Sequence, residues 1–158
     1  MPQRVVVIGV GNQLRGDDAA GLAAVAQLRT RKLAESITIA MHEGEAIALH
    51  ELWDGADALV LVDTVSSGAA PGTVHRIDAS GAALPAALQR GSSHAIGVAD
   101  AIELARVLGT LPRRVIVYGI EGAGFELGAA LSDDVAAALD ELIDALRDEA
   151  LALRVSTA

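Results

Sequence analysis

The stretch RVVVIGV, Arg4 to Val10, is a continuous run of mostly β-branched residues that is followed by a glycine. It is too short for a buried helix and is typical of a strand that is covered on both faces. The next segment, Ala19–Lys32, carries apolar residues at helical spacing, among them Leu22 and Leu28. A buried strand followed by a helix predicts the first unit of an α/β fold, and the rest of the chain continues this alternation.

Three further helices and four further strands are predicted along the chain. The strands are expected at Ile37–Met41, Asp57–Asp63, Thr73–Asp78 and Arg113–Ile120, and the helices at Glu45–Trp53, His94–Leu108 and Asp133–Glu149, the last with Ser132 as its N-cap. Only nine residues, Thr64–Gly72, separate the third strand from the fourth. Because a parallel crossover usually needs a dozen or more residues, we expect these two strands to be antiparallel. The elements predict an α/β sandwich of three layers, with a twisted, mostly parallel five-stranded sheet, one antiparallel edge strand and helices on both faces.

The composition excludes several classes of function. The length of 158 residues predicts a single domain over residues 1–158. The chain is 52% hydrophobic but only 2% aromatic, so its 32 alanines and other aliphatic residues are expected to fill the core. The formal charge of −9 and the scarcity of aromatic rings argue against nucleic-acid binding. The absence of cysteine excludes disulfides and a thiol nucleophile. No apolar run is long enough to span a membrane, and we expect a cytoplasmic protein.

Carboxylates and imidazoles follow the predicted strands, at the edge of a parallel sheet where ligands bind. The first strand is followed by GNQLRGDD, which ends in Asp17 and Asp18; the third ends at Asp63, and His94 begins a helix. Glu121 and the segment His42-Glu43-Gly44-Glu45 follow two other strands. Asp17 or Asp18, Asp63 and His94 together predict an O/O/N site for a divalent ion such as nickel, zinc, manganese or iron. The alternatives are that the aspartates only cap a helix or bond to loop amides, and that the histidine is exposed.

Two other motifs are incomplete. Gly9-Val10-Gly11 after the first strand is part of a dinucleotide fingerprint, but Leu14 stands in place of the third glycine. Asp63, a serine (Ser66 or Ser93) and His94 supply the residue types of a serine triad, but no GxSxG motif places a serine on a strand-to-helix turn.

The segment VVVIGVGNQLRGDDAAG, Val5 to Gly21, resembles the opening of the hydrogenase maturation proteases. The resemblance continues through LVLVDTVSSGAAPGTVHRID (Leu59–Asp78), SSHAIGVADAIELARVLGTLPRRVIVYGIE (Ser92–Glu121) and LSDDVAAAL (Leu131–Leu139). It implies a phosphorylase/hydrolase-like fold and an endopeptidase that removes the C-terminal extension of a [NiFe] hydrogenase large-subunit precursor.

The resemblance also implies a role for three residues. In the family the positions of Asp18, Asp63 and His94 contact nickel, which arrives already bound to the precursor, and no organic cofactor is expected. Many members carry an Asp-Gly-Gly segment where this chain has His42-Glu43-Gly44-Glu45. The chain lacks a cysteine and a serine elbow, so water is the expected attacking group. Two alternatives remain: a Rossmann-like nucleotide-binding protein that uses Gly9-Val10-Gly11, and an acidic docking module without catalytic activity.

Overall fold

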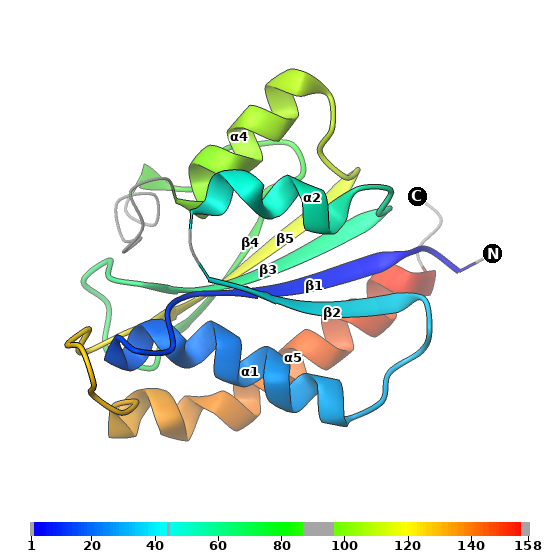
Figure 1. Cartoon of the computed structure of the whole chain (residues 1–158). Coiled ribbons are helices and arrows are strands. Elements are labelled where there is room, and N and C mark those ends of the chain that lie inside the picture. Colours follow the sequence, from blue (N-terminus) through cyan, green and yellow to red (C-terminus); the bar gives the residue numbers. More distant parts are fainter. Residues whose placement is uncertain (1, 44, 87–96, 156–158) are drawn as a thin grey trace.

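The computed structural model describes residues 2–43, 45–86 and 97–155. Within these residues five strands form one sheet in the order β2-β1-β3-β5-β4, and helices cover both of its faces (Figure 1). The strands are β1 (Val5–Val10), β2 (Ile37–His42), β3 (Ala58–Val65), β4 (Val74–Asp78) and β5 (Arg114–Glu121). The helices are the 3₁₀ turns η1 (Gly16–Ala19) and η2 (Ala46–Leu49) and the α-helices α1 (Ala20–Thr30), α2 (His50–Trp53), α4 (Val98–Leu108) and α5 (Asp133–Val155). The predicted three-layer α/β fold is confirmed.

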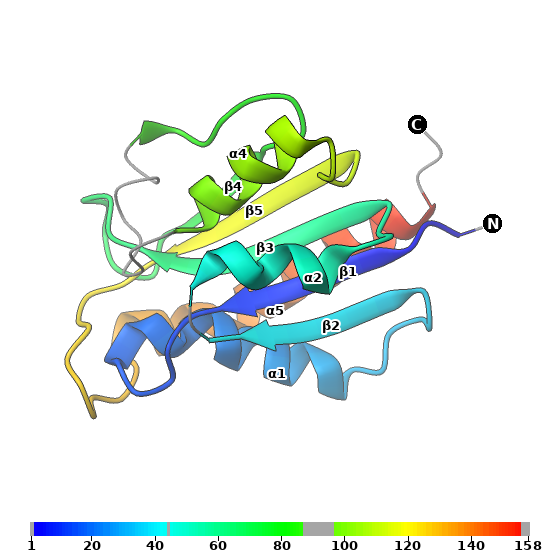
Figure 2. The ribbon, with the colours of Figure 1, turned by 45° about the horizontal axis from the view of Figure 1, so that its top comes forward.

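The β1 strand is buried along its whole length, as its sequence predicts. Val5 and Val7 pack on the side of α1 and α5, whereas Val6 and Ile8 pack on the side of α2 and α4. Figure 2 shows the two helix layers on opposite faces of the twisted sheet. Because every second side chain of a strand points to the same face, a continuous run of apolar residues contributes side chains to the cores on both faces of the sheet.

The antiparallel edge strand is confirmed, but its neighbour differs from the one expected. β1 pairs in parallel with β2 and β3, and β3 pairs in parallel with β5. β4 is antiparallel and pairs with β5, with Val74 opposite Ile120. The connection through α4 returns β5 to the free edge of β3, so β4 has only the outer edge of β5 with which to pair.

Three boundaries differ from the predicted ones, by two residues at the end of β3, four at the start of α4 and six at the end of α5. β3 continues to Val65, so that Asp63 lies inside the strand instead of ending it. α4 begins at Val98, after Gly97 in an extended conformation, whereas its predicted start at His94 lies outside the described residues. α5 extends to Val155, six residues beyond the predicted end, because Ala150 and Leu153 keep its apolar face buried.

Two glycines bring the start of α1 close to the sheet. A Cβ atom on Gly9 of β1 would lie 2.5 Å from the carbonyl oxygen of Gly21, and one on Gly21 would lie 2.7 Å from the carbonyl oxygen of Val62. No larger residue fits at either position without a shift of the backbone. The close packing places η1, which precedes α1, directly against the carboxyl ends of β1 and β3. These two strands flank the point where the strand order reverses, which is the usual ligand site of an open α/β sheet.

Candidate active site

The structure brings two of the three predicted site residues together. Asp18 lies in η1 and Asp63 lies near the end of β3, and their exposed fractions are only 1% and 4%. Burial and the neighbouring charge of Asp18 raise the pKa of Asp63 to about 8, although the amide of Thr64 donates to Asp63 Oδ1 at 2.8 Å. Asp63 therefore retains a proton at neutral pH. A buried acidic pair of this kind is favourable for binding a cation, because a positive ion removes both the repulsion and the need for the proton.

Asp17 has a different role from its neighbour. Its carboxylate is fully buried and accepts four hydrogen bonds, from the amides of Ala123, Gly124 and Ser132 at 2.7, 3.2 and 2.7 Å and from the hydroxyl of Ser132 at 2.8 Å. Burial alone would raise the pKa of Asp17, but these hydrogen bonds together lower it below its ordinary value. Asp17 thus orders the loop between β5 and α5, which is one of the two roles left open for it by the sequence.

Ser132 occupies the predicted N-cap position of α5, with one difference. Its carbonyl accepts the first helical hydrogen bond, from the amide of Ala136 at 2.9 Å. Its hydroxyl donates to Asp17, whereas the side chain of an ordinary N-cap accepts a hydrogen bond from an amide of its own helix. The start of α5 is therefore tied to the acidic turn of η1, more than 100 residues away in the sequence.

Further contacts join the loops around the acidic pair. The amide of Gln13 donates to Glu43 Oε1 at 3.0 Å, so Glu43 connects the loop after β2 to the loop after β1. The amide of Gly128 donates to the carbonyl of Leu14 at 2.8 Å. Within the described residues, the predicted His42-Glu43-Gly44-Glu45 segment thus provides a loop-to-loop contact through Glu43.

The third predicted site residue, His94, lies outside the described residues. In the described part of the chain no group of three His, Cys, Asp or Glu residues gathers as a metal site. Asp18 and Asp63 supply two carboxylates, whose oxygens suit a divalent ion of borderline character, and a histidine would complete the predicted O/O/N set. The donor types fit nickel, with His94 remaining a sequence-based prediction.

A fourth buried carboxylate at this edge, besides Asp17, Asp18 and Asp63, was not assigned a partner from the sequence. Glu121, at the end of β5, accepts hydrogen bonds from the amide and the hydroxyl of Ser67, and His75 Nε2 lies 3.1 Å from its Oε1. Ser67 contacts the carboxylate directly and not the imidazole, so this is not the serine–histidine–acid relay of the hydrolases. The group ties the connection between β3 and β4 to β5. His75, which lies on the edge strand β4, is half-buried by it.

The glycines of the partial dinucleotide fingerprint serve packing. A Cβ atom on Gly11 would lie 2.0 Å from the carbonyl oxygen of Asp18, and Gly9 is filled by α1 as described above. The position ahead of α1, where a dinucleotide fold holds the pyrophosphate, is occupied by the acidic turn with Asp17 and Asp18. Two carboxyl groups in this place disfavour a phosphate.

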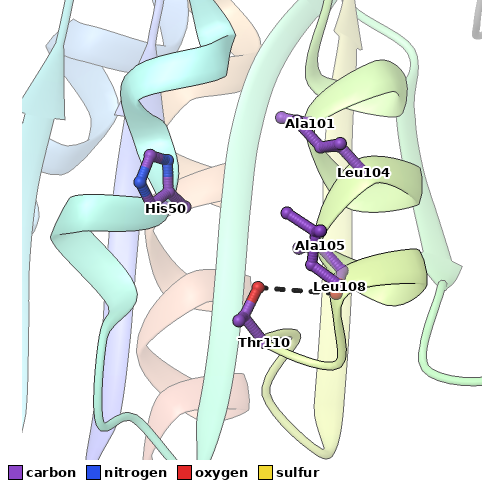
Figure 3. Close-up of a pocket in the computed structure, with 6 residues that line it drawn as sticks. All are labelled: His50, Ala101, Leu104, Ala105, Leu108 and Thr110. Atoms are coloured by element: carbon purple, nitrogen blue, oxygen red, sulfur yellow. Dashed lines mark hydrogen bonds between the residues drawn. The ribbon is translucent and has the colours of Figure 1, made fainter.

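A pocket of about 300 Å³ lies between α2 and α4 (Figure 3). Its lining consists of His50, Ala101, Leu104, Ala105, Leu108 and Thr110. The hydroxyl of Thr110 is satisfied by the carbonyl of Ala105 at 3.4 Å. The lining is mainly apolar and holds no carboxylate, so its chemistry differs from that of the acidic pair.

Two buried carboxyl groups at the switch point of an α/β sheet place ionisable side chains where such folds bind their ligands. The family model of the hydrogenase maturation proteases matches residues 44–149. The chain belongs to the hydrogenase maturation protease family.

Relatives and solved structures agree with this assignment. The hydrogenase 2 maturation protease of Escherichia coli (strain K12) is 30% identical over 153 residues, which cover 92% of both chains. The hydrogenase expression/formation protein HupM of Azotobacter chroococcum is 28% identical over 86% of this chain, which spans only 66% of that protein's length. The structure of the hydrogenase maturating endopeptidase HybD from E. coli superposes with a TM-score of 0.72 at 25% identity, covering 92% of this chain and 93% of the other. The comparisons give no support to the nucleotide-binding alternative.

Proposed function

We propose that this protein is an endopeptidase that removes the C-terminal extension of a [NiFe] hydrogenase large-subunit precursor after nickel has been inserted. The observation that supports this proposal most strongly is the buried pair of Asp18 and Asp63 at the carboxyl edge of the sheet, in a chain of the maturation protease family. A buried pair of carboxyl groups is better matched to a cation, such as the nickel of a loaded precursor, than to solvent.

Asp18, Asp63 and His94 are the residues that we propose as the nickel-recognising and catalytic set. Nickel is bound by the substrate, and its recognition by the protease restricts cleavage to precursor that already contains the ion. The two carboxylates and the imidazole add hard ligands to an ion that the precursor already holds, and so place the scissile peptide against the site. Water attacks the carbonyl carbon of this peptide, the C–N bond breaks, and the released amine takes up a proton.

Within the described residues no helix is long and apolar enough to cross a membrane. The cytoplasm remains the predicted compartment.

Incubation of the purified chain with nickel-loaded and nickel-free large-subunit precursor tests the proposal. We expect a loss of mass from the C-terminus of the loaded precursor only. Cleavage of both forms would remove the recognition role of nickel. Association with the precursor without any loss of mass would instead support the docking module.

The proposed residues are tested by Asp18→Asn, Asp63→Asn and His94→Ala, each of which is expected to abolish trimming. The melting temperatures of the two aspartate variants are expected to stay at or above that of the parent. Asp18→Asn removes the charge that disfavours ionisation of Asp63, and Asp63→Asn replaces a protonated carboxyl group with a neutral amide of the same size, so neither change is expected to destabilise the fold. Asp144→Asn and His50→Ala are the matched controls, since both positions lie on exposed helix surfaces. Normal trimming by the His94→Ala variant would contradict its place in the site.

A further inference from the structure

Thr64 lies between the two acidic segments of the site and contacts both. It follows Asp63 in β3, and its exposed fraction is 1%. Its amide donates to Asp63 Oδ1 at 2.8 Å, and its hydroxyl donates to the backbone carbonyl of Asp17 at 2.7 Å. That carbonyl belongs to the peptide unit that leads into Asp18. One residue therefore holds the side chain of one acid and the backbone of the other.

The surroundings of Thr64 leave it little freedom to move. Its backbone is paired in register with Ile120 of β5. Its methyl group lies 3.0 Å from where a Cβ atom of Gly122 would be, which is closer than an ordinary van der Waals contact. Because the central strands fix the position of Thr64, the hydrogen bond from its hydroxyl fixes the position of the Asp17 carbonyl.

The carbonyl of Asp17 has a second partner, which makes the role of the hydroxyl separable from the integrity of the turn. The amide of Ala20 also donates to this carbonyl, closing the 3₁₀ turn of η1. Loss of the Thr64 hydroxyl therefore leaves the carbonyl satisfied and the turn intact. What is lost is a hydrogen bond that joins η1 directly to the residue after Asp63.

We propose that Thr64 is a positioning residue that sets the distance and orientation between Asp18 and Asp63. The functional meaning of this role rests on the proposed function, because it is the joint use of the two carboxylates that the spacing serves. A threonine is suited to the position for two reasons: its branched Cβ favours a central strand, and its hydroxyl reaches the neighbouring turn.

The test compares Thr64→Val, which keeps the shape and removes the hydroxyl, with Thr64→Ser, which keeps the hydroxyl. Binding of Ni²⁺ alone to the purified chain is measured by calorimetry, and kcat and KM are measured for trimming of the loaded precursor. Residues that orient metal ligands typically change metal affinity or activity by about 10–100-fold, and we expect a loss of this order for Thr64→Val with recovery in Thr64→Ser. Thr30→Val is the matched control, because the hydroxyl of Thr30 also donates to a backbone carbonyl, at 2.6 Å, but lies at the far end of α1.

Several outcomes would overturn the proposal. Parent-like binding and trimming by Thr64→Val is one, and an equal loss in Thr64→Ser is another. If the valine variant is too unstable to measure, Thr64→Ala is compared with Thr64→Ser, because these two variants differ only in the hydroxyl. Equal binding and trimming by this pair would also contradict the proposal.

A crystal structure of each variant separates this inference from the proposed function. A changed separation of the carboxyl groups of Asp18 and Asp63 in Thr64→Val supports the positioning role, and an unchanged one contradicts it, even if the parent trims no precursor. Failure of the parent to trim contradicts the proposed function alone.

Discussion

Replacement of Asp17 by asparagine tests how the acidic turn is held in place. The two adjacent aspartates are chemically identical, but the carboxylate of Asp17 accepts hydrogen bonds from the loop between β5 and α5, whereas the charge of Asp18 acts on Asp63. Asp17→Asn keeps the size of the side chain and removes its charge. We expect this change to destabilise the fold. Asp18→Asn is not expected to do so, because it removes the charge that disfavours ionisation of Asp63.

The magnitude follows from the four hydrogen bonds of Asp17. An asparagine has one acceptor oxygen and one amide that cannot accept, so in its better orientation it still leaves the amide of Ser132 without an acceptor. A buried donor without a partner costs about 1–3 kcal/mol. The remaining hydrogen bonds no longer have a charged acceptor, so each loses about half of its strength. The sum is a loss of about 3–5 kcal/mol in the free energy of unfolding, a large part of the 5–15 kcal/mol that is typical of a domain.

The assay is unfolding in guanidinium chloride, followed by the fluorescence of Trp53. This residue is the only tryptophan of the chain and is 1% exposed, so its emission reports the loss of the core. The midpoint is expected to fall for Asp17→Asn and to remain or rise for Asp18→Asn, with an unchanged slope. The reasoning fails if Asp17→Asn stays within about 1 kcal/mol of the parent, the effect of an ordinary substitution, or if Asp18→Asn is the more damaging change.

Two further predictions concern protonation. Asp63 has a pKa of about 8 in the folded state against 3.8 in the unfolded chain, so the folded state binds more protons between these values. This carboxyl group therefore lowers the free energy of unfolding as the pH rises from about 4 to about 8, and denaturation at several pH values should show a smaller slope in Asp18→Asn. Tyr118, the only tyrosine, has its pKa raised to about 12 by burial and by the hydrogen bond to Glu149; absorbance titration should show this value, and a lower one in Glu149→Gln. An ordinary value near 10 in the parent would contradict the contact.

Much of the fold could be predicted from local patterns. The run at residues 4–10 identifies a strand buried on both faces, because no polar residue interrupts it, and β1 confirms this. The pattern could not show where β5 lies, since the choice between pairing β4 with β3 or with β5 depends on a crossover that no local signal describes. Likewise the end of β3 could not be placed, because Thr64 and Val65 are held in the strand by pairing with β5.

The sequence by itself determined the chemical types available at the site: carboxylates after the first and third strands, no thiol, and a family pattern that includes His94. Only the tertiary structure decided how the two adjacent aspartates divide their roles. The direction of each side chain is set by what packs against η1, and residues 17 and 18 of a tight turn face different neighbours. Asp17 meets the amides of a loop that begins at residue 122, whereas Asp18 faces Asp63. Contacts between segments so far apart in the chain leave no spacing that could be recognised in the sequence.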